Sequence, residues 1–140
     1  MRFSLLGNLI IPEEKGRVIS TRILSADENG SLTESTIQTK GNLLGEEFTT
    51  ILTVTTRRDQ WGISRLEGQG VCTTKSGEEI RWKGFGVGWP SGKGAGMVGR
   101  FTETWFASSS KNAWLNKIIG IEEFEIDENG NTSDQVWEWK

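Results

Sequence analysis

The sequence predicts an all-β fold: a single antiparallel up-and-down β-barrel of eight to nine strands with one short helix. Turn signals recur at short intervals along the 140 residues, and the runs between them are rich in Thr, Ile, Val, Phe and Trp. This is the pattern of hairpin-linked strands. Glycines alternate with large aromatic residues between Gly68 and Gly99, as in a sharply bent sheet. No linker divides the chain, so residues 1–140 are expected to form one domain.

The turn signals divide the chain into nine expected strands. Most of the turns contain glycine, which accepts the positive φ that tight hairpins need. The turn signals lie at 12–16, 27–30, 40–42, 58–59, 75–77, 90–94 and 127–130. The strands expected between them span 2–11, 17–26, 31–40, 46–57, 61–74, 78–89, 97–108, 121–127 and 132–139. Closure of these strands into a barrel would remove the exposed edges of the sheet.

The glycine-rich segment is interpreted as a barrel wall that bends over bulky partners. Residues 84–89 read Gly-Phe-Gly-Val-Gly-Trp. Glycine adds no side chain to a strand and costs backbone entropy, so its repetition at every second position needs a structural reason. Large and small residues that oppose each other suit the tapered interior of a small barrel.

One segment, residues 109–119, predicts a short helix. Serines precede it, Gly120 follows its last apolar residue, and the apolar residues at 114, 115, 118 and 119 fall on one helical face. We expect this helix to close or flank one end of the barrel.

The composition excludes several classes of function. The net charge is −3 and the 16 basic residues are scattered, whereas nucleic acids and anionic membranes attract clustered positive charge. Histidine is absent, which removes Ser-His-Asp and Cys-His catalytic sites and most zinc, copper and haem sites. We therefore expect no metal, no cofactor, no nucleic acid and no membrane among the partners.

The cysteine content and the first residues bear on localisation. Cys72 is the single cysteine, so no internal disulfide forms, and a cytoplasmic protein is the simplest expectation. The apolar run near the N-terminus is short and interrupted by Gly7 and Asn8, and we interpret it as a first strand rather than as a signal peptide. Cys72 itself is expected to be buried and inert, because no histidine is present to lower the pKa of its thiol.

Glu103 is the candidate catalytic residue. Strand alternation places it on the same face as Phe101 and Trp105. If that face lines the lumen, burial among aromatic rings would raise the pKa of the carboxyl and suit it to general acid/base chemistry. In the alternative interpretation, Glu103 faces solvent or pairs with an arginine on a neighbouring strand, and alternation alone does not decide which face is inside.

The aromatic residues of the same region are candidates for a ligand-binding wall. An apolar cavity of this kind binds apolar small molecules, although most of the seven tryptophans are also explained as ordinary core. Arginines of this region are expected either in structural ion pairs or as anchors for a ligand carboxylate. The candidate ligand-binding residues are Trp82, Phe85, Trp89, Phe101, Trp105, Arg81 and Arg100.

Two further patterns carry weaker signals. Glu122, Glu123 and Glu125 could place two carboxylates on one face, although clustered glutamates on a strand are more typical of a solvated face. The glycines at 84–88 and 92–96 superficially resemble phosphate-binding loops, but no helix follows them and the Lys-Ser/Thr ending is absent. The second is expected to be a hairpin or cavity-mouth loop.

The Gly-x-Gly strands, the Lys75-Ser-Gly-Glu78 hairpin, the aromatic strands and the closing Phe124-Glu-Ile-Asp127 hairpin resemble the small allene oxide cyclase-like barrels and their bacterial relatives. The resemblance covers roughly residues 45–140. It implies an eight-stranded barrel with an apolar cavity, frequently oligomeric and free of cofactor, in which the cyclases act mainly by shaping a reactive substrate. It assigns no catalytic residue, and a calycin-type binding barrel would look similar.

Three functional hypotheses follow. The first is a barrel that binds an apolar small molecule in an aromatic-lined cavity. The second is a cofactor-free cyclase or isomerase on the same scaffold, with Glu103 as acid/base or electrostatic stabiliser. The third is a non-enzymatic interaction protein with a filled barrel, whose exposed aromatic residues form a homo-oligomer or partner interface.

Overall fold

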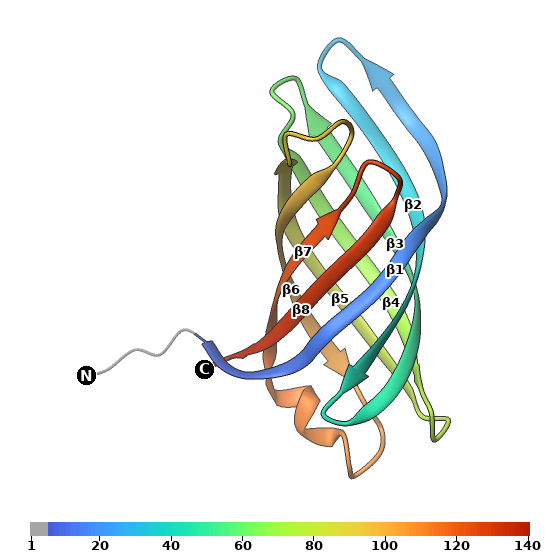
Figure 1. The fold of residues 1–140 in the computed structure, drawn as a ribbon, viewed down its shortest axis with the longest axis vertical. Helices are drawn as coiled ribbons and strands as arrows, with labels where there is room; N and C mark the ends of the chain where they lie inside the picture. The colour runs from blue at the N-terminus through green and yellow to red at the C-terminus, as the bar shows by residue number, and fades with distance from the viewer. Residues whose placement is uncertain (1–5) are drawn as a thin grey trace, which may run out of the picture.

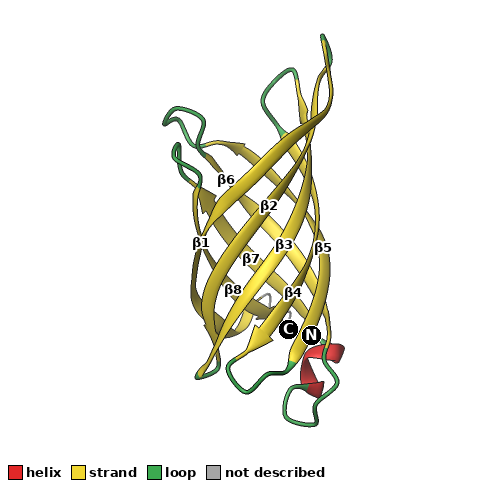
Figure 2. Cartoon of the chain, turned by 90° about the vertical axis from the view of Figure 1, so that its right-hand side faces the viewer, coloured by secondary structure: helices red, strands yellow, loops and turns green. Residues whose placement is uncertain are grey.

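The computed structural model describes residues 6–140, which form a closed barrel of eight antiparallel strands (Figures 1 and 2). The strands are β1 (Leu6–Asp27), β2 (Gly30–Leu43), β3 (Glu46–Asp59), β4 (Ser64–Thr74), β5 (Glu79–Pro90), β6 (Met97–Phe106), β7 (Ile119–Ile126) and β8 (Asn131–Trp139). Consecutive strands are hydrogen-bonded neighbours, and β1 pairs with both β2 and β8, which closes the barrel. The predicted up-and-down barrel is confirmed, with eight strands rather than nine.

The difference in strand number arises in β1, which joins the strands expected at 2–11 and 17–26. The turn expected at 12–16 does not form. Instead the register of β1 against β8 shifts repeatedly between Leu6 and Glu14, so Pro12, which has no N–H to donate, lies in an irregular stretch where a ladder bond is not required. The carbonyl oxygen of Pro12 accepts a 2.9 Å hydrogen bond from the side chain of Gln135. Residues 2–5 of the expected first strand lie outside the described residues.

The repeated sequence Asp-Glu-Asn-Gly, at 27–30 and 127–130, forms a hairpin turn at both places, with the same side-chain hydrogen bond. In each, the Asp side chain accepts a 2.8 Å hydrogen bond from the backbone N–H of the Asn two residues later, and the glycine has positive φ. The turn expected at 40–42 is wrong, because that segment continues β2. The chain reverses instead at Leu44 and Gly45, which both have positive φ.

The helix expected at 109–119 is also shorter than predicted, because only a 3₁₀ helix forms, at Ala113–Lys117. It belongs to the connection between β6 and β7 and lies at one end of the barrel (Figure 2). The carboxyl of Glu78 holds this connection: it accepts hydrogen bonds from the backbone N–H and hydroxyl of Ser109 and from the side-chain amide of Asn112. These contacts take the place of regular helical bonds around the turn.

Alternation along the strands separates a lumen face from an outer face, and glycines of the wall lie against aromatic rings of the lumen. Gly70 is the cross-strand partner of Trp82, and a Cβ at Gly70 would meet the indole ring. A Cβ at Gly120 would likewise meet Trp105. The glycines therefore make room for large rings inside a narrow barrel, which agrees with the interpretation of the glycine-rich segment.

The end of the barrel next to the 3₁₀ helix is filled by an apolar core. Ile10, Ile80, Leu115 and Val136 are all at most 1% exposed. At the other end the β1–β2 hairpin extends past its neighbours (Figure 1). The interior is thus packed at one end, and any internal space lies above that packed layer.

Candidate binding pocket in the barrel lumen

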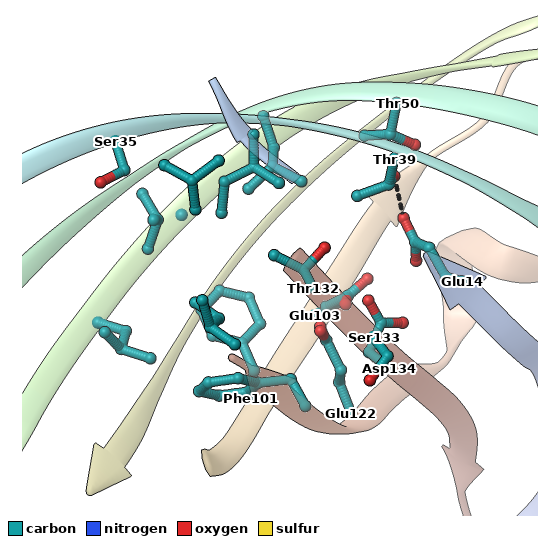
Figure 3. Close-up of a pocket in the computed structure, with 18 of the residues that line it drawn as sticks. Glu14, Ser35, Thr39, Thr50, Phe101, Glu103, Glu122, Thr132, Ser133 and Asp134 are labelled. Atoms are coloured by element: carbon teal, nitrogen blue, oxygen red, sulfur yellow. Dashed lines mark hydrogen bonds between the residues drawn. The ribbon is translucent and has the colours of Figure 1, made fainter. Parts of the chain in front are cut away.

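A pocket of about 320 Å³ lies inside the barrel and is lined by residues from all eight strands. Leu115 of the 3₁₀ helix lines it at the packed end, and Ser31 and Arg58 line it towards the opposite end. Figure 3 shows the lining side chains converging on this space. The volume falls within the range of roughly 300–1,000 Å³ that is typical of small-molecule sites.

The side of the pocket formed by β2–β5 carries most of its large apolar side chains, interspersed with serines and threonines. We call this side the apolar wall; its principal side chains are Ile37, Leu52, Leu66, Ile80 and Trp82. Phe101 of β6 continues it, since its ring makes an edge-to-face contact with Trp82 at a centroid distance of 6.0 Å and an interplanar angle of 83°. This pair gives the pocket a rigid aromatic surface.

The other side carries four carboxyl groups, one from each of four neighbouring strands. We call this side the acidic wall; its members are Glu14 on β1, Glu103 on β6, Glu122 on β7 and Asp134 on β8. These strands are contiguous because β8 pairs with β1. Figure 3 shows the four carboxyl groups gathered on one side of the pocket.

The four carboxyl groups form a connected hydrogen-bonded row. The hydroxyl of Thr39 donates to Glu14 Oε2, and Glu14 in turn contacts the carboxyl of Asp134. The carboxyls of Asp134 and Glu122 are also hydrogen-bonded, as are those of Glu122 and Glu103. A carboxyl–carboxyl hydrogen bond requires a proton on one of the two groups, so the row holds protons that exposed carboxylates would lose.

Burial raises the pKa of every member of the acidic wall. Desolvation is the main cause in each case, and it raises the pKa of Glu103 to about 7 from 4.5. The pKa values of Glu122 and Asp134 are raised well above their usual range by burial and then by the neighbouring carboxylates, and that of Glu14 is raised by burial. Glu122 and Asp134 keep some accessible surface because they face the pocket.

The acidic wall lacks compensating positive charge. None of the ion pairs found in residues 6–140 includes a member of the wall. Arg58, near the far end of β3, is the single basic side chain among the described lining residues. A buried carboxylate without a partner is costly, which explains why protonation is favoured instead.

The pocket also contains polar oxygens that have no hydrogen-bond partner. Within the described residues these are Ser64 Oγ, Thr132 Oγ1 and Asp134 Oδ1, the last with no donor besides neighbouring carboxyls. All three residues line this pocket, and Ser64 is only 1% exposed. Buried polar groups are normally satisfied, so their concentration at one pocket indicates where a bonding partner is needed.

The structure places Glu103 where one of the two interpretations expected it. Glu103 is 6% exposed and lies on the lumen face of β6 with Phe101 and Trp105, both buried. It faces neither solvent nor an arginine. Trp82 also lies in the lumen, so four of the candidate site residues come together, while their role in binding or catalysis stays a prediction.

The other four candidates lie on the outer face, which corrects the expectation that they line the cavity. Phe85 is 67% exposed, Trp89 is 37% exposed, and Arg81 and Arg100 are exposed as well. Residues 81, 85 and 89 have the opposite strand parity to Trp82, so they cannot share its face. Arg100 lies over the Trp89 ring at 5.9 Å and pairs with Glu123 at 3.6 Å.

The outer-face aromatic residues leave the oligomer prediction open. Phe85, Phe106 and Trp61 are all more than half exposed. The homo-oligomer expected from the sequence stays a prediction, which light scattering would test directly.

Alternation also separates the glutamates of β7. Glu122 faces the pocket, whereas Glu123 points outward to Arg100. The carboxyl partner of Glu122 is therefore Glu103 on β6 rather than its neighbour in the sequence. Glu125 contributes at the pocket edge but is exposed.

Two members of the acidic wall were missed in the sequence. Glu14 lies in the segment interpreted as a turn, so no lumen face was assigned to it. Asp134 gave a signal: alternation along β8 places it on the same face as Val136, which is fully buried. A charged residue in phase with a buried apolar residue indicates a polar group inside the barrel.

Other sequence features lie where they were expected or outside the pocket. Cys72 is buried, and desolvation raises the pKa of its thiol to about 12, with a further contribution from Glu14. Lys93 is exposed in the connection between β5 and β6. In residues 6–140, no group of three or more His, Cys, Asp or Glu side chains has an arrangement suited to a metal ion.

Comparison with solved structures shows the fold and no activity. A protein of unknown function from Clostridium acetobutylicum matches at 13% identity and a TM-score of 0.85, over 99% of this chain and 100% of that one. A conserved protein of unknown function from Rhodopseudomonas palustris matches at 10% identity and 0.82, over 98% and 99%. A β-barrel like protein from Acinetobacter baumannii matches at 12% identity and 0.79, over 95% and 96%.

No protein-family model and no curated protein matches the sequence. The names of these three structures describe a β-barrel or an unknown function. The resemblance to allene oxide cyclase-like barrels therefore stays a prediction. In the described part of the chain, none of the helices has the length and apolar character needed to cross a bilayer.

Proposed function

We propose that the barrel binds a small, largely apolar molecule in its lumen. The observation that carries this proposal is the pocket of about 320 Å³ above the packed core, with the apolar wall on one side and a few polar groups on the other. Small-molecule sites have this composition, because apolar surface supplies affinity and a few polar groups fix orientation. Eight-stranded barrels have interiors that hold either packed side chains or one small ligand.

Binding of a neutral apolar dye tests the proposal. N-phenyl-1-naphthylamine gains fluorescence in apolar surroundings, and its entry into the pocket should give a saturable signal. A ligand that binds only the native barrel also raises the melting temperature, with about 2.7 kcal/mol of added stability at a hundredfold excess over its Kd. The absence of both a fluorescence signal and a shift in melting temperature would contradict the proposal. It would favour an interaction protein with a filled barrel.

A pair of variants ties the signal to the lumen. Leu52 points into the pocket, whereas its neighbour Ile51 is 56% exposed on the outer face. Leu52→Trp should fill the pocket and abolish dye binding, while Ile51→Trp adds the same ring outside and should leave binding unchanged. Circular dichroism checks that both variants retain the barrel. Equal binding by both would place the dye outside the lumen.

A second candidate function is a cofactor-free isomerase or cyclase that uses the same pocket. The hydrogen-bonded pair of Glu103 and Glu122 favours it, because enclosed carboxyl pairs with raised pKa values are suited to exchange protons with a bound substrate near neutral pH. In this mechanism the ionised carboxyl removes a proton from carbon and the protonated one returns it at another position, while the apolar wall holds the substrate conformation.

Deuterium exchange separates this candidate from simple binding. Compounds that displace the bound dye identify ligands. A ligand with an acidic C–H should then exchange that hydrogen for deuterium in D₂O when the barrel is present, as followed by NMR. Glu103→Gln should retain binding and lose most of the exchange, and the exposed Glu123→Gln should retain both. Binding without exchange would leave a binding barrel.

A further inference from the structure

The acidic wall lies opposite an apolar surface within one pocket, and together they define the chemistry of a ligand. The wall brings four carboxyl groups from contiguous strands to one side of the space. Trp82, Phe101 and Leu66 contribute apolar surface across from it. A ligand that fits both sides needs a polar end that donates hydrogen bonds and a body that is apolar.

Unpartnered oxygens show, independently of the number of acids, that the pocket has room for a further hydrogen-bonding group. Ser64 Oγ, 1% exposed, and the buried Thr132 Oγ1 and Asp134 Oδ1 all border the pocket without a partner in the described residues, apart from carboxyl neighbours of Asp134. An ionised carboxylate only accepts hydrogen bonds, and an ammonium group only donates, with three N–H directions available. At the acidic wall such a group can donate to Asp134 and to Thr132, which lie two residues apart on the lumen face of β8.

The charges around the pocket select a cation over an anion. None of the ion pairs in residues 6–140 neutralises the wall, and the basic Arg58 lines the pocket near the end of β3, beside the loop that follows it. An ammonium can take the place of the protons that the wall shares, which leaves ionised carboxylates as its partners, whereas a ligand carboxylate finds no cation at the wall. The apolar side chains opposite the wall favour an organic cation, because they offer a surface that the body of such a ligand can cover.

We propose that the natural ligand is an organic amine: a protonated amino group that binds between Asp134, Glu122 and Glu103, joined to an apolar body that packs on Trp82 and Phe101. This proposal rests on the proposed function, since it requires that the lumen bind a small molecule. It adds the chemical class of that molecule and the end of the ligand that each wall contacts. The hydroxyl of Thr39, which already donates to Glu14, holds the fourth carboxyl beside the ammonium site.

Three matched probes test the class of ligand without any change to the protein. They are 2-(1-naphthyl)ethylamine, 2-(1-naphthyl)ethanol and 1-naphthylacetic acid, which share the ring system and differ in the charge of the end group. Calorimetry at pH 7.5 should show the amine binding at least about tenfold more tightly than the alcohol, as expected for charge-assisted hydrogen bonds. The acid should bind most weakly.

Variants then locate the ammonium. Asp134→Asn and Glu122→Gln keep the side-chain shape and should each weaken the amine about tenfold while changing the alcohol less than twofold. Glu123→Gln, one residue away but on the outer face, should leave both affinities unchanged. The three-probe comparison on the unmodified protein remains decisive if either lumen variant does not fold.

The outcomes separate this proposal from the proposed function. Equal or tighter binding of the alcohol or the acid would overturn the amine proposal and leave a lumen-binding protein. The same holds if the neutral dye binds and none of the naphthyl probes does. Failure of all probes and of the dye would overturn both.

Discussion

The two sides of the lumen differ in how they are built and in what they do for stability. The apolar wall on β2–β5 buries aliphatic and aromatic side chains and is fitted closely to the backbone, as where Gly70 lies against the Trp82 ring. The acidic wall on β1 and β6–β8 gathers four carboxyl groups, none of which forms an ion pair within residues 6–140. Burial of apolar surface stabilises the barrel, whereas burial of unpaired carboxyls opposes folding. A costly feature on an otherwise well-packed interior indicates a function.

The largest effect expected from this contrast is the pH dependence of stability. In the folded barrel Glu103 keeps its proton up to a pH of about 7, whereas an unfolded glutamate loses it near 4.5. The native state therefore binds more protons between these values, and raising the pH favours unfolding. The stabilisation is complete below about 4.5 and is lost as the pH rises through about 7, and the raised pKa values of Glu122 and Asp134 extend this window upwards.

Urea denaturation should accordingly give a free energy of unfolding on the order of 3 kcal/mol lower at pH 8 than at pH 5, at about 1.4 kcal/mol for each unit of pKa elevation. The pKa values of Glu78 and Asp127 are lowered by hydrogen bonds. The stability that these two carboxylates contribute is lost only at more acidic pH, so they do not change the comparison between pH 5 and pH 8. The double variant Glu103→Gln/Glu122→Gln should show a much flatter profile. Stability that rises between pH 5 and 8 in the unmodified barrel would mean that the wall is solvated.

The second effect concerns the fit of the apolar wall. Gly70→Val should lower the free energy of unfolding by about 2 kcal/mol, because the added carbons would overlap the indole of Trp82, which has little room to move. Thermal or urea unfolding measures the change. Gly7→Val is the matched control, since the atoms nearest to a Cβ there belong to the flexible side chain of Lys140. Similar losses in both variants would indicate a general cost of removing a strand glycine rather than a collision with the ring.

The same contrast explains how much could be predicted from the sequence. Hairpin turns and the alternation of glycine with aromatic residues are local patterns. The barrel, and the presence of aromatic rings against its glycines, could therefore be predicted. The acidic wall is not local: its members are as far apart as Glu14 and Asp134 and meet only after β8 pairs with β1. Glu103 was identified because aromatic residues flank it on its own strand. Glu14 was missed because Pro12 and Gly16 gave its segment the composition of a turn, although pairing with two neighbouring strands keeps that segment extended.

A third effect, a part of the first, isolates one member of the acidic wall. Glu103→Gln should restore most of the roughly 3 kcal/mol that the unmodified barrel loses at pH 8, because it removes a charge that burial disfavours while keeping a donor for Glu122. At pH 5 the variant should match the unmodified protein, since Glu103 is then already protonated. Denaturation at both pH values measures this difference. Glu123→Gln, which loses an exposed ion pair with Arg100, should change the free energy of unfolding little at either pH. Destabilisation by Glu103→Gln at pH 8 would contradict the prediction and assign Glu103 a supporting structural role.

The last prediction is that Cys72 does not react in the native protein. It tests whether the apolar wall excludes water. Cys72 lies on β4 among the lining residues, and burial raises the pKa of its thiol to about 12. Because the thiolate is the reactive form, iodoacetamide at pH 8 should leave the native protein unmodified over a period in which the urea-unfolded chain is fully alkylated, as followed by mass spectrometry. Rapid alkylation of the native barrel would show that water and reagent reach the apolar wall. The two walls would then share one hydrated lumen, and the raised pKa values of the acidic wall would lose their physical cause.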